Sequence, residues 1–347
     1  MTYLILGRGR QAHAYRSALE QVTGAPDAVW QVDVAQGTAA LRRGGWDGVL
    51  FCGEETAVAD LLEQAVDANA APLICCPVRL RPQHALALRE RALAHGVGVT
   101  VGFVAPVSPG VAALHLEMSE WSDGAAPVSV QVEQQLPSAS TLVEFEQAVL
   151  DAAVTLAHVA GDWPLRVSAI LATAQDARAA ALSATCLGAP GTTGALSVAL
   201  GPGFPSRRIR VVTAAATFLL EESAVGGWLS VQAEASPMAL AAGAEAQEGA
   251  AAASEIPVPV LDASRAVVVR FLRRLRHGGA DDLATLSRGL ALAETLWHST
   301  RQDGEVQAVG YQHEIPASPR LHLLRGGRPD QLPAGAPRSP SSLTVVR

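Results

Sequence analysis

The chain has 347 residues, of which 49% are hydrophobic and 17% charged, and its formal net charge is -7. With a mean hydropathy of +0.21, this composition is typical of a globular protein that buries a sizeable core, and it excludes disordered and fibrous classes. The acidic balance argues against nucleic-acid binding, and no run approaches the ~18 consecutive apolar residues of a membrane span. We therefore expect a soluble, cytoplasmic protein of two domains, with no nucleic-acid or membrane partner.

The first third of the chain alternates between short apolar runs and segments with helical spacing. Strands are predicted at residues 2–6, 28–33, 48–53, 72–76 and 97–103, and helices at 12–22, 56–69 and 82–95. Strands that alternate with helices of this length predict a parallel, doubly wound sheet of the α/β class.

The pattern changes near residue 120. Longer strands with partial period-two alternation are predicted at 128–136, 166–174, 193–200, 208–222 and 228–235, and helices at 142–160, 262–277 and 281–302. This half predicts an α+β domain with an open, largely antiparallel sheet. We place the domains at 1–120 and 121–325, with 239–255 as a loop or frayed helix and 326–347 as a disordered tail.

A glycine-rich turn is the strongest local signal. Gly7, Gly9 and Ala12 have the GxGxxA spacing directly after a strand and at the start of a helix. Gly7 permits the tight turn, Gly9 lets a pyrophosphate approach the backbone, and Ala12 permits close packing of helix and strand. The turn therefore predicts a dinucleotide site, although a glycine turn without a ligand stays open. The residues assigned to the cofactor here are Gly7, Arg8, Gly9, Arg10, Gln11 and Ala12, the two arginines as phosphate ligands or as plain surface residues.

Asp33 follows the second predicted strand, 26 residues after Gly7. The dinucleotide fold places there a carboxylate that accepts hydrogen bonds from the adenosine ribose, which favours NAD because a carboxylate repels a 2′-phosphate. Arg42 and Arg43 follow closely, so NADP stays possible. A carboxylate that only caps a turn is the simpler alternative.

Taken in order, these elements resemble the glucose-fructose oxidoreductase, inositol dehydrogenase and MocA (Gfo/Idh/MocA) family over most of residues 2–310. The quoted segments are GxGxxA, WDGVLFCGEET, AHGVGVTVGFVAPVSPGV, LDAAVTLAHVAGDWPLRVSA and LSRGLALAETLWHSTRQDGEV. The resemblance implies a dinucleotide-binding Rossmann domain, with Gly53 beside the cofactor. It also implies a second domain whose sheet often forms an oligomer interface. Because large exposed apolar patches are rare, we expect a homo-oligomer, with a dimer as the first choice.

The resemblance fails at the family's catalytic positions. The family manages the hydroxyl proton with a lysine from an EKP motif and often with a histidine, but this chain contains no lysine at all. Cys75 and Cys76 stand where Glu and Lys would be, ahead of the retained Pro77, and the histidine position falls on Asp151.

Three residues are the candidates for acid/base chemistry. Cys76 is a titratable thiol, Asp151 becomes a base if burial raises its pKa, and His158 titrates near neutrality on the same helix face, seven residues after Asp151. Each also has a purely structural interpretation. Cys76 can be a small buried residue, Asp151 a helix-surface carboxylate and His158 a core or surface histidine. No metal site is predicted, because the histidines and cysteines show no shared ligand spacing.

Two hypotheses of different classes follow. The first is an NAD(P)-dependent oxidoreductase that acts on a small hydroxylated or carbonyl substrate with atypical acid/base residues. The second, motivated by the missing lysine, is a non-catalytic dinucleotide-binding sensor or scaffold of the same fold.

Overall fold

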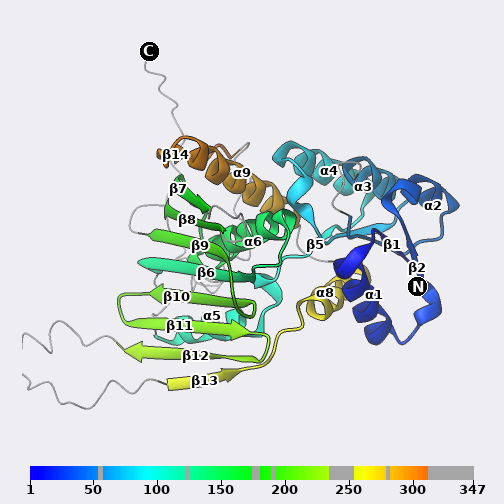
Figure 1. Ribbon diagram of the computed structural model, residues 1–347. Helices are drawn as coiled ribbons and strands as arrows, with labels where there is room; N and C mark the ends of the chain where they lie inside the picture. Colours follow the sequence, from blue (N-terminus) through cyan, green and yellow to red (C-terminus); the bar gives the residue numbers. More distant parts are fainter. Residues whose placement is uncertain are drawn as a thin grey trace, which may run out of the picture.

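The computed structural model describes residues 1–53, 58–121, 126–173, 180–188, 192–233, 254–278 and 282–311, which form two sheets side by side (Figure 1). The segment 234–253 and the tail 326–347 lie outside the described residues. No helix among the described residues has both the length and the hydrophobicity needed to cross a lipid bilayer.

The first sheet is parallel throughout, as the alternating pattern predicts. Its strand order is β2-β1-β3-β4-β5. The order reverses between β1 and β3, and ligands of open α/β sheets bind outside the carboxyl ends of the strands at such a point. The strands are β1 (Tyr3–Leu6), β2 (Val29–Val32), β3 (Gly48–Phe51), β4 (Ala71–Ile74) and β5 (Thr100–Val101).

Helices from both halves of the sequence cover this sheet. The helices of the first half are α1 (Gly9–Thr23), α2 (Gly37–Arg43), α3 (Val58–Asp67) and α4 (Pro82–His95), with 3₁₀ turns η1 (Pro26–Ala28), η2 (Val34–Gln36), η3 (Pro77–Arg79) and η4 (Ala105–Val107). From the end of the chain, α8 (Ala263–His277) packs on α1, and α9 (Asp282–Arg301) packs on α4. The pattern did not predict the short helix α2.

In the described part of the chain, the second sheet has nine strands and is open and largely antiparallel, which confirms the expected fold class. Its order is β13-β12-β11-β10-β6-β9-β8-β7-β14, and among these strands only β6 and β9 pair in parallel. The strands are β6 (Ser129–Pro137), β7 (Arg166–Thr173), β8 (Ala180–Leu187), β9 (Thr193–Gly201), β10 (Ser206–Val212), β11 (Ala216–Ser223), β12 (Gly226–Ala233), β13 (Ser254–Val258) and β14 (Gln307–Ala308).

The single strand predicted at 208–222 is wrong. The structure has two strands there, β10 and β11, joined by a turn at 213–215. The Thr213 hydroxyl stabilises this turn by accepting hydrogen bonds from the N–H groups of Ala215 and Ala216. Strands β8 and β13 were not predicted. Ser254 and Glu255, assigned to a loop or frayed helix, begin β13.

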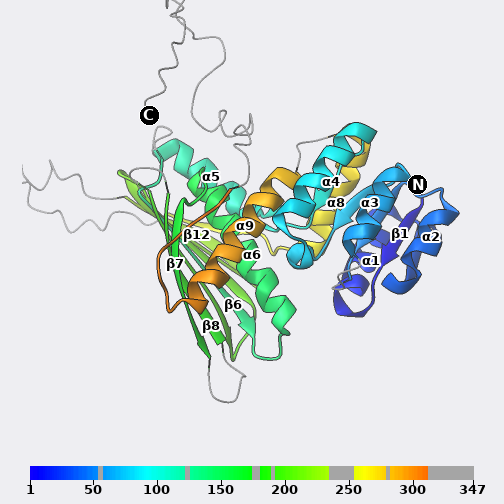
Figure 2. The same ribbon diagram turned by 90° about the horizontal axis from the view of Figure 1, so that it is seen from above.

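Helices cover one face of the second sheet and leave the other open (Figure 2). The covering helices are α5 (Pro109–Trp121), α6 (Leu142–Ala160) and α9. Helix α6 begins with a capping box in which Thr141 and Glu144 satisfy each other's backbone N–H groups. Because α6 also contacts η3 and η4, it stands between the second sheet and the carboxyl ends of the first.

Candidate functional site

The glycine turn lies at the carboxyl end of β1, at the switch point of the first sheet. Gly7 has a φ of 133° and Gly9 a φ of 86°, values that residues with a side chain rarely adopt. A Cβ on Gly7 would lie 2.8 Å from the backbone of Cys52 and of Gly53, so this glycine lets β1 and β3 end in contact. The Gly7 N–H donates to Val32, and the Gly7 carbonyl accepts from Gln31.

The start of α1 fits the pyrophosphate of a dinucleotide. Apart from its own neighbours in the helix, no described residue has an atom within 4 Å of the position that a Cβ on Gly9 would take, and the N-cap residue Arg8 makes no side-chain capping bond. The first turn carries no acidic residue, so no carboxylate of its own competes with an anion for its N–H groups and the positive end of the helix. Ala12 is 0% exposed and seats the helix on the sheet.

Asp33 ends β2 beside this turn, where the ribose-binding carboxylate was predicted. Its Oδ2 lies 2.7 Å from Nη2 of Arg8. Both side chains reach solvent, so the ion pair is weak and can open for a ligand.

The N-terminal half of α6 lies beside the turn and the segment that follows β4, and two ion pairs join them. Arg10 pairs with Glu144 at 2.5 Å, and Arg79 pairs with Glu146 at 3.3 Å. Gln11 donates to the carbonyl of Cys75 and ties α1 to the end of β4. Of the predicted cofactor residues, the turn, Gln11 and Gly53 therefore lie together at the edge of the first sheet.

Three cysteines and a tyrosine are buried beneath the carboxyl edge of the first sheet. Cys76 follows β4 and is buried, as are the free thiols of Cys52 and Cys75. Tyr15 of α1 is buried in the same cluster as Cys75. Burial, followed by the neighbouring Cys52, raises the pKa of Cys75 well above its usual value, which makes this thiol a poor proton donor.

Asp151 lies on α6 and is only 6% exposed. Its Oδ1 accepts a 3.1 Å hydrogen bond from the N–H of Val104, which follows β5 at the carboxyl edge of the first sheet. Burial raises the pKa of Asp151 even though Arg207 opposes the shift. A buried carboxyl with a raised pKa can both take and give a proton, which is the property the sequence analysis required of this residue.

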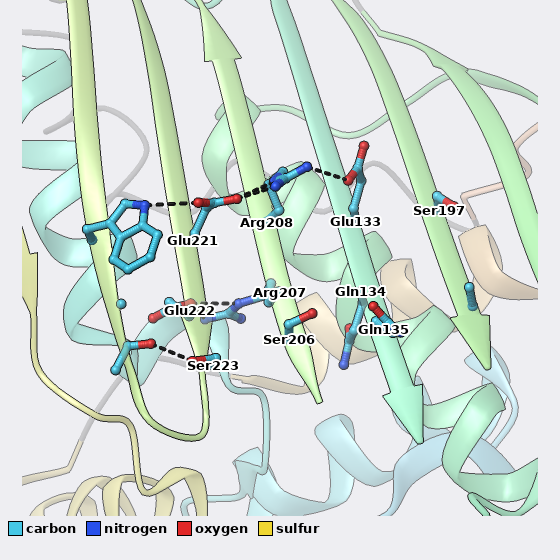
Figure 3. A pocket seen from close by; sticks show the side chains of 14 residues that line it. Glu133, Gln134, Gln135, Ser197, Ser206, Arg207, Arg208, Glu221, Glu222 and Ser223 are labelled. Carbon is cyan, nitrogen blue, oxygen red and sulfur yellow. Dashed lines mark hydrogen bonds and ion pairs between the residues drawn. The ribbon is translucent and has the colours of Figure 1, made fainter. Parts of the chain in front are cut away.

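Arg207 and Glu222 complete the surroundings of Asp151 and were missed in the sequence. They are directly opposed on β10 and β11, and Nη2 of Arg207 lies 2.5 Å from Oε2 of Glu222 (Figure 3). The signal that finds them is the alternation of each strand. Arg207 is in phase with the buried Ile209, and Glu222 with the buried Leu220, so both point to the inner face.

His158 lies two turns further along α6 and packs against His115 of α5, with ring centroids 5.1 Å apart. Burial, with help from His115 and Arg270, lowers the pKa of His158 to about 4. The imidazole is therefore neutral at pH 7. Thus His158 contacts α5, whereas Asp151 contacts the edge of the first sheet.

The open face of the second sheet carries polar hollows. One pocket of about 430 Å³ is lined by residues of β6 and β9 to β12. Glu133, Arg208 and Glu221 form a row of ion pairs across it (Figure 3), and Trp228 donates to Glu221. The hollows on this face are lined mainly by polar side chains. Within the described residues, no three His, Cys, Asp or Glu side chains gather as a metal site.

Comparisons with known proteins agree on the architecture. No family model matches the chain, and no curated protein matches it in sequence. UDP-N-acetylglucosamine 3-dehydrogenase from Acidithiobacillus ferrooxidans has a similar structure, with a TM-score of 0.68 and 16% identity over 87% of this chain and 98% of that one.

Two further solved structures are similar. An oxidoreductase from Agrobacterium radiobacter in complex with NAD+, L-tartaric acid and magnesium has a TM-score of 0.67 and 13% identity over 89% of this chain and 98% of that one. Levoglucosan dehydrogenase in complex with NADH and L-sorbose has a TM-score of 0.67 and 10% identity over 90% and 99%. At these identities the likeness establishes the two-sheet fold.

Proposed function

We propose that the protein is an NAD-dependent oxidoreductase that acts on a small hydroxylated or carbonyl substrate at the carboxyl edge of the first sheet, beside α6. One observation carries the proposal. The open, uncapped start of α1 lies on the same side of the molecule as a buried carboxyl, Asp151, which reaches the carboxyl edge of the sheet through Val104. The structurally similar dehydrogenases, two of them crystallised with NAD+ or NADH, support this choice of cofactor.

The residues of the turn would hold the dinucleotide. The N–H groups of the first turn of α1 would bind the pyrophosphate, and Asp33 would accept hydrogen bonds from the adenosine ribose. A bound nicotinamide supplies the group that accepts or donates a hydride. Gly53, which follows β3, would lie beside that group.

Asp151 would handle the substrate hydroxyl proton. Loss of hydride from an alcohol carbon requires loss of the proton from its oxygen, and a positioned base contributes about 10² to 10⁴ in rate. As a carboxylate, Asp151 would take this proton during oxidation, and in the protonated form it would return the proton during reduction. Cys76 and His158 remain the other two proposed acid/base residues, at the end of β4 and on α6.

The deciding experiment is a titration of nucleotide-stripped protein with NADH and NADPH, followed by nicotinamide fluorescence. Saturable binding that favours NADH is expected, and a screen of polyols, sugars and their keto forms should then give turnover. Absence of binding to either nucleotide would refute the proposal.

A non-catalytic dinucleotide-binding protein is the second candidate. The absence of lysine from the chain favours it, because the acid/base group of the resembling family is missing. This candidate predicts NADH binding without turnover of any screened substrate and without an effect of Asp151→Asn on binding.

We also propose a homodimer formed through the open face of the second sheet. Glu133 and Glu221 alternate with Arg208 and Arg210 across this face, so a second copy rotated by a two-fold axis can set its arginines against these carboxylates. Trp228 is 53% exposed beside the row and offers apolar area for the same contact. The proposed setting is the cytoplasm, where the four cysteine thiols would stay reduced.

A further inference from the structure

Asp151 and Glu222 both lie near the guanidinium of Arg207, but Glu222 is much closer to it than Asp151. We propose that Glu222 holds the guanidinium of Arg207 away from Asp151 and thereby leaves the Asp151 carboxyl able to exchange a proton with the substrate. Arg207 and Glu222 are in this view positioning residues for the reaction. The catalytic part of the inference rests on the proposed function, whereas its structural part concerns Asp151 alone.

The geometry of Arg207 shows the imbalance. Its Nε and Nη2 lie 2.8 and 2.5 Å from Oε2 of Glu222. Its Nη1 lies 4.0 Å from Oδ2 of Asp151, which is beyond hydrogen-bonding distance, and this atom has no hydrogen-bond partner among the described residues. The arginine is 8% exposed, so solvent does little to weaken either interaction.

Glu222 is held in place by a second hydrogen bond, which stabilises its ion pair with Arg207. Its other oxygen, Oε1, accepts a 2.6 Å hydrogen bond from the hydroxyl of Ser108. Ser108 in turn accepts from the N–H of Val111, so Glu222 sits at the start of α5, where the helix dipole stabilises a negative charge. The cross-strand register opposes Glu222 directly to Arg207.

Within the described residues, Asp151 is left with one short partner, the N–H of Val104. The charged or titratable groups that face it from the described elements are Arg207 from β10, Glu222 from β11 and Tyr15 from α1. A direct ion pair with Arg207 would hold the carboxyl ionised and remove its capacity to donate a proton. Because Glu222 already neutralises Arg207, burial decides the balance, and the pKa of Asp151 is raised.

The test compares variants whose effects should have opposite signs. Glu222→Gln keeps the size of the side chain and an acceptor for Ser108 but removes the charge, so Arg207 should turn to Asp151. The titration of Asp151 should then move to lower pH by about one unit or more, a tenfold change in proton affinity. Arg207→Gln should move it to higher pH, and Arg207→Lys should stay closer to the native protein because it retains the cation.

The readout is the carboxyl infrared band of the full chain titrated without substrate, with Asp151→Asn used to assign the band. The pH dependence of kcat should shift in the same two directions. The matched control is Asp67→Asn with Arg91→Gln, an exposed ion pair between α3 and α4 that should leave the Asp151 band unchanged. Circular dichroism verifies folding. If Arg207→Gln does not fold, the Asp151 titrations in Glu222→Gln and Arg207→Lys test the inference.

The outcomes separate the inference from the proposed function. Shifts of equal sign in the two variants, or no shift in Glu222→Gln, would overturn the inference. Opposite shifts without any detectable oxidoreductase activity would support the coupling of the three residues and count against the proposed function. Oxidoreductase activity without these shifts would support the proposed function and overturn the coupling of the three residues.

Discussion

Arg8 and Asp33 form a 2.7 Å ion pair that joins the start of helix α1 to the end of strand β2. Arg8 thus rests on the carboxylate that is proposed to bind the ribose, and a ribose hydroxyl would compete with it. Asp33→Asn removes the negative charge that repels a 2′-phosphate and frees Arg8 to pair with that phosphate. The ratio of NADH to NADPH affinity should fall at least tenfold, measured by fluorescence titration. Asp27→Asn, in η1, is the control, and an unchanged ratio would contradict the proposed role of Asp33.

A bulky residue at Gly9 should abolish dinucleotide binding. Gly9→Leu would fill the space in front of the first turn of α1, where the pyrophosphate is expected. Because Gly9 has a positive φ, part of the effect will be backbone strain. Gly24→Leu is therefore the matched control, since Gly24 ends the same helix with a φ of 65° and also faces open space. Equal NADH affinity in both variants would show that the cofactor lies elsewhere.

Replacement of the Asp151 carboxyl should affect turnover and spare cofactor binding. Asp151→Asn keeps an oxygen that can accept from Val104, so the local contact is retained while the titratable proton is lost. The expected result is a loss of about 10² to 10⁴ in kcat with unchanged NADH affinity. Cys76→Ala and His158→Gln, measured beside it, rank the three candidates. If a variant keeps full activity, the side chain that it lacks is not the proton-transferring group.

Acid should destabilise the protein through His158. Its folded-state pKa is about 4, below the ordinary value of 6.5, because burial opposes the charged form. Between these two values the unfolded chain binds the extra proton, so stability is fully present above pH 6.5 and is lost as the pH falls toward 4. The loss reaches up to about 3 kcal/mol. Denaturant unfolding at pH 7 and 4.5 should show a smaller pH effect in His158→Gln than in the native protein.

Charge reversal on the open face of the second sheet should break the proposed dimer. Arg208 pairs with Glu221 and Glu133 in the same row (Figure 3), so Arg208→Glu would place three carboxylates together. Light scattering at micromolar concentration is expected to report a dimer for the native chain and a monomer for Arg208→Glu. Arg16→Glu on α1 is the control, and a native protein that is monomeric would refute this interface.

The sequence predicts the five strands of the first sheet because each has a local signal. The glycine turn, the short apolar runs and the helical spacing in α1, α3 and α4 are all readable within a few residues, whereas the short helix α2 was missed. The joint between β10 and β11 was missed because its apolar run continues through the turn, where the Thr213 hydroxyl rather than a glycine or proline satisfies the backbone. Turns of this kind carry little sequence signal.

The surroundings of Asp151 are a different case. Asp151 and Arg207 are far apart in the sequence and meet only because α6 packs on the inner face of the second sheet. Strand alternation places Arg207 and Glu222 on that face, but it does not say which helix residue lies opposite them. The acid/base candidate was therefore available from the sequence, and the residues that surround it were not.

The packing of α8 has a consequence for folding during synthesis on the ribosome. Val267, Val268 and Phe271 of this helix are buried in one cluster with Tyr3 and Ile5 of β1, which is synthesised long before α8. The amino-terminal strands must therefore wait for a partner made more than two hundred residues later. Until then the nascent chain exposes an apolar surface beneath the future glycine turn, and a premature stop before α8 would leave that surface permanently uncovered.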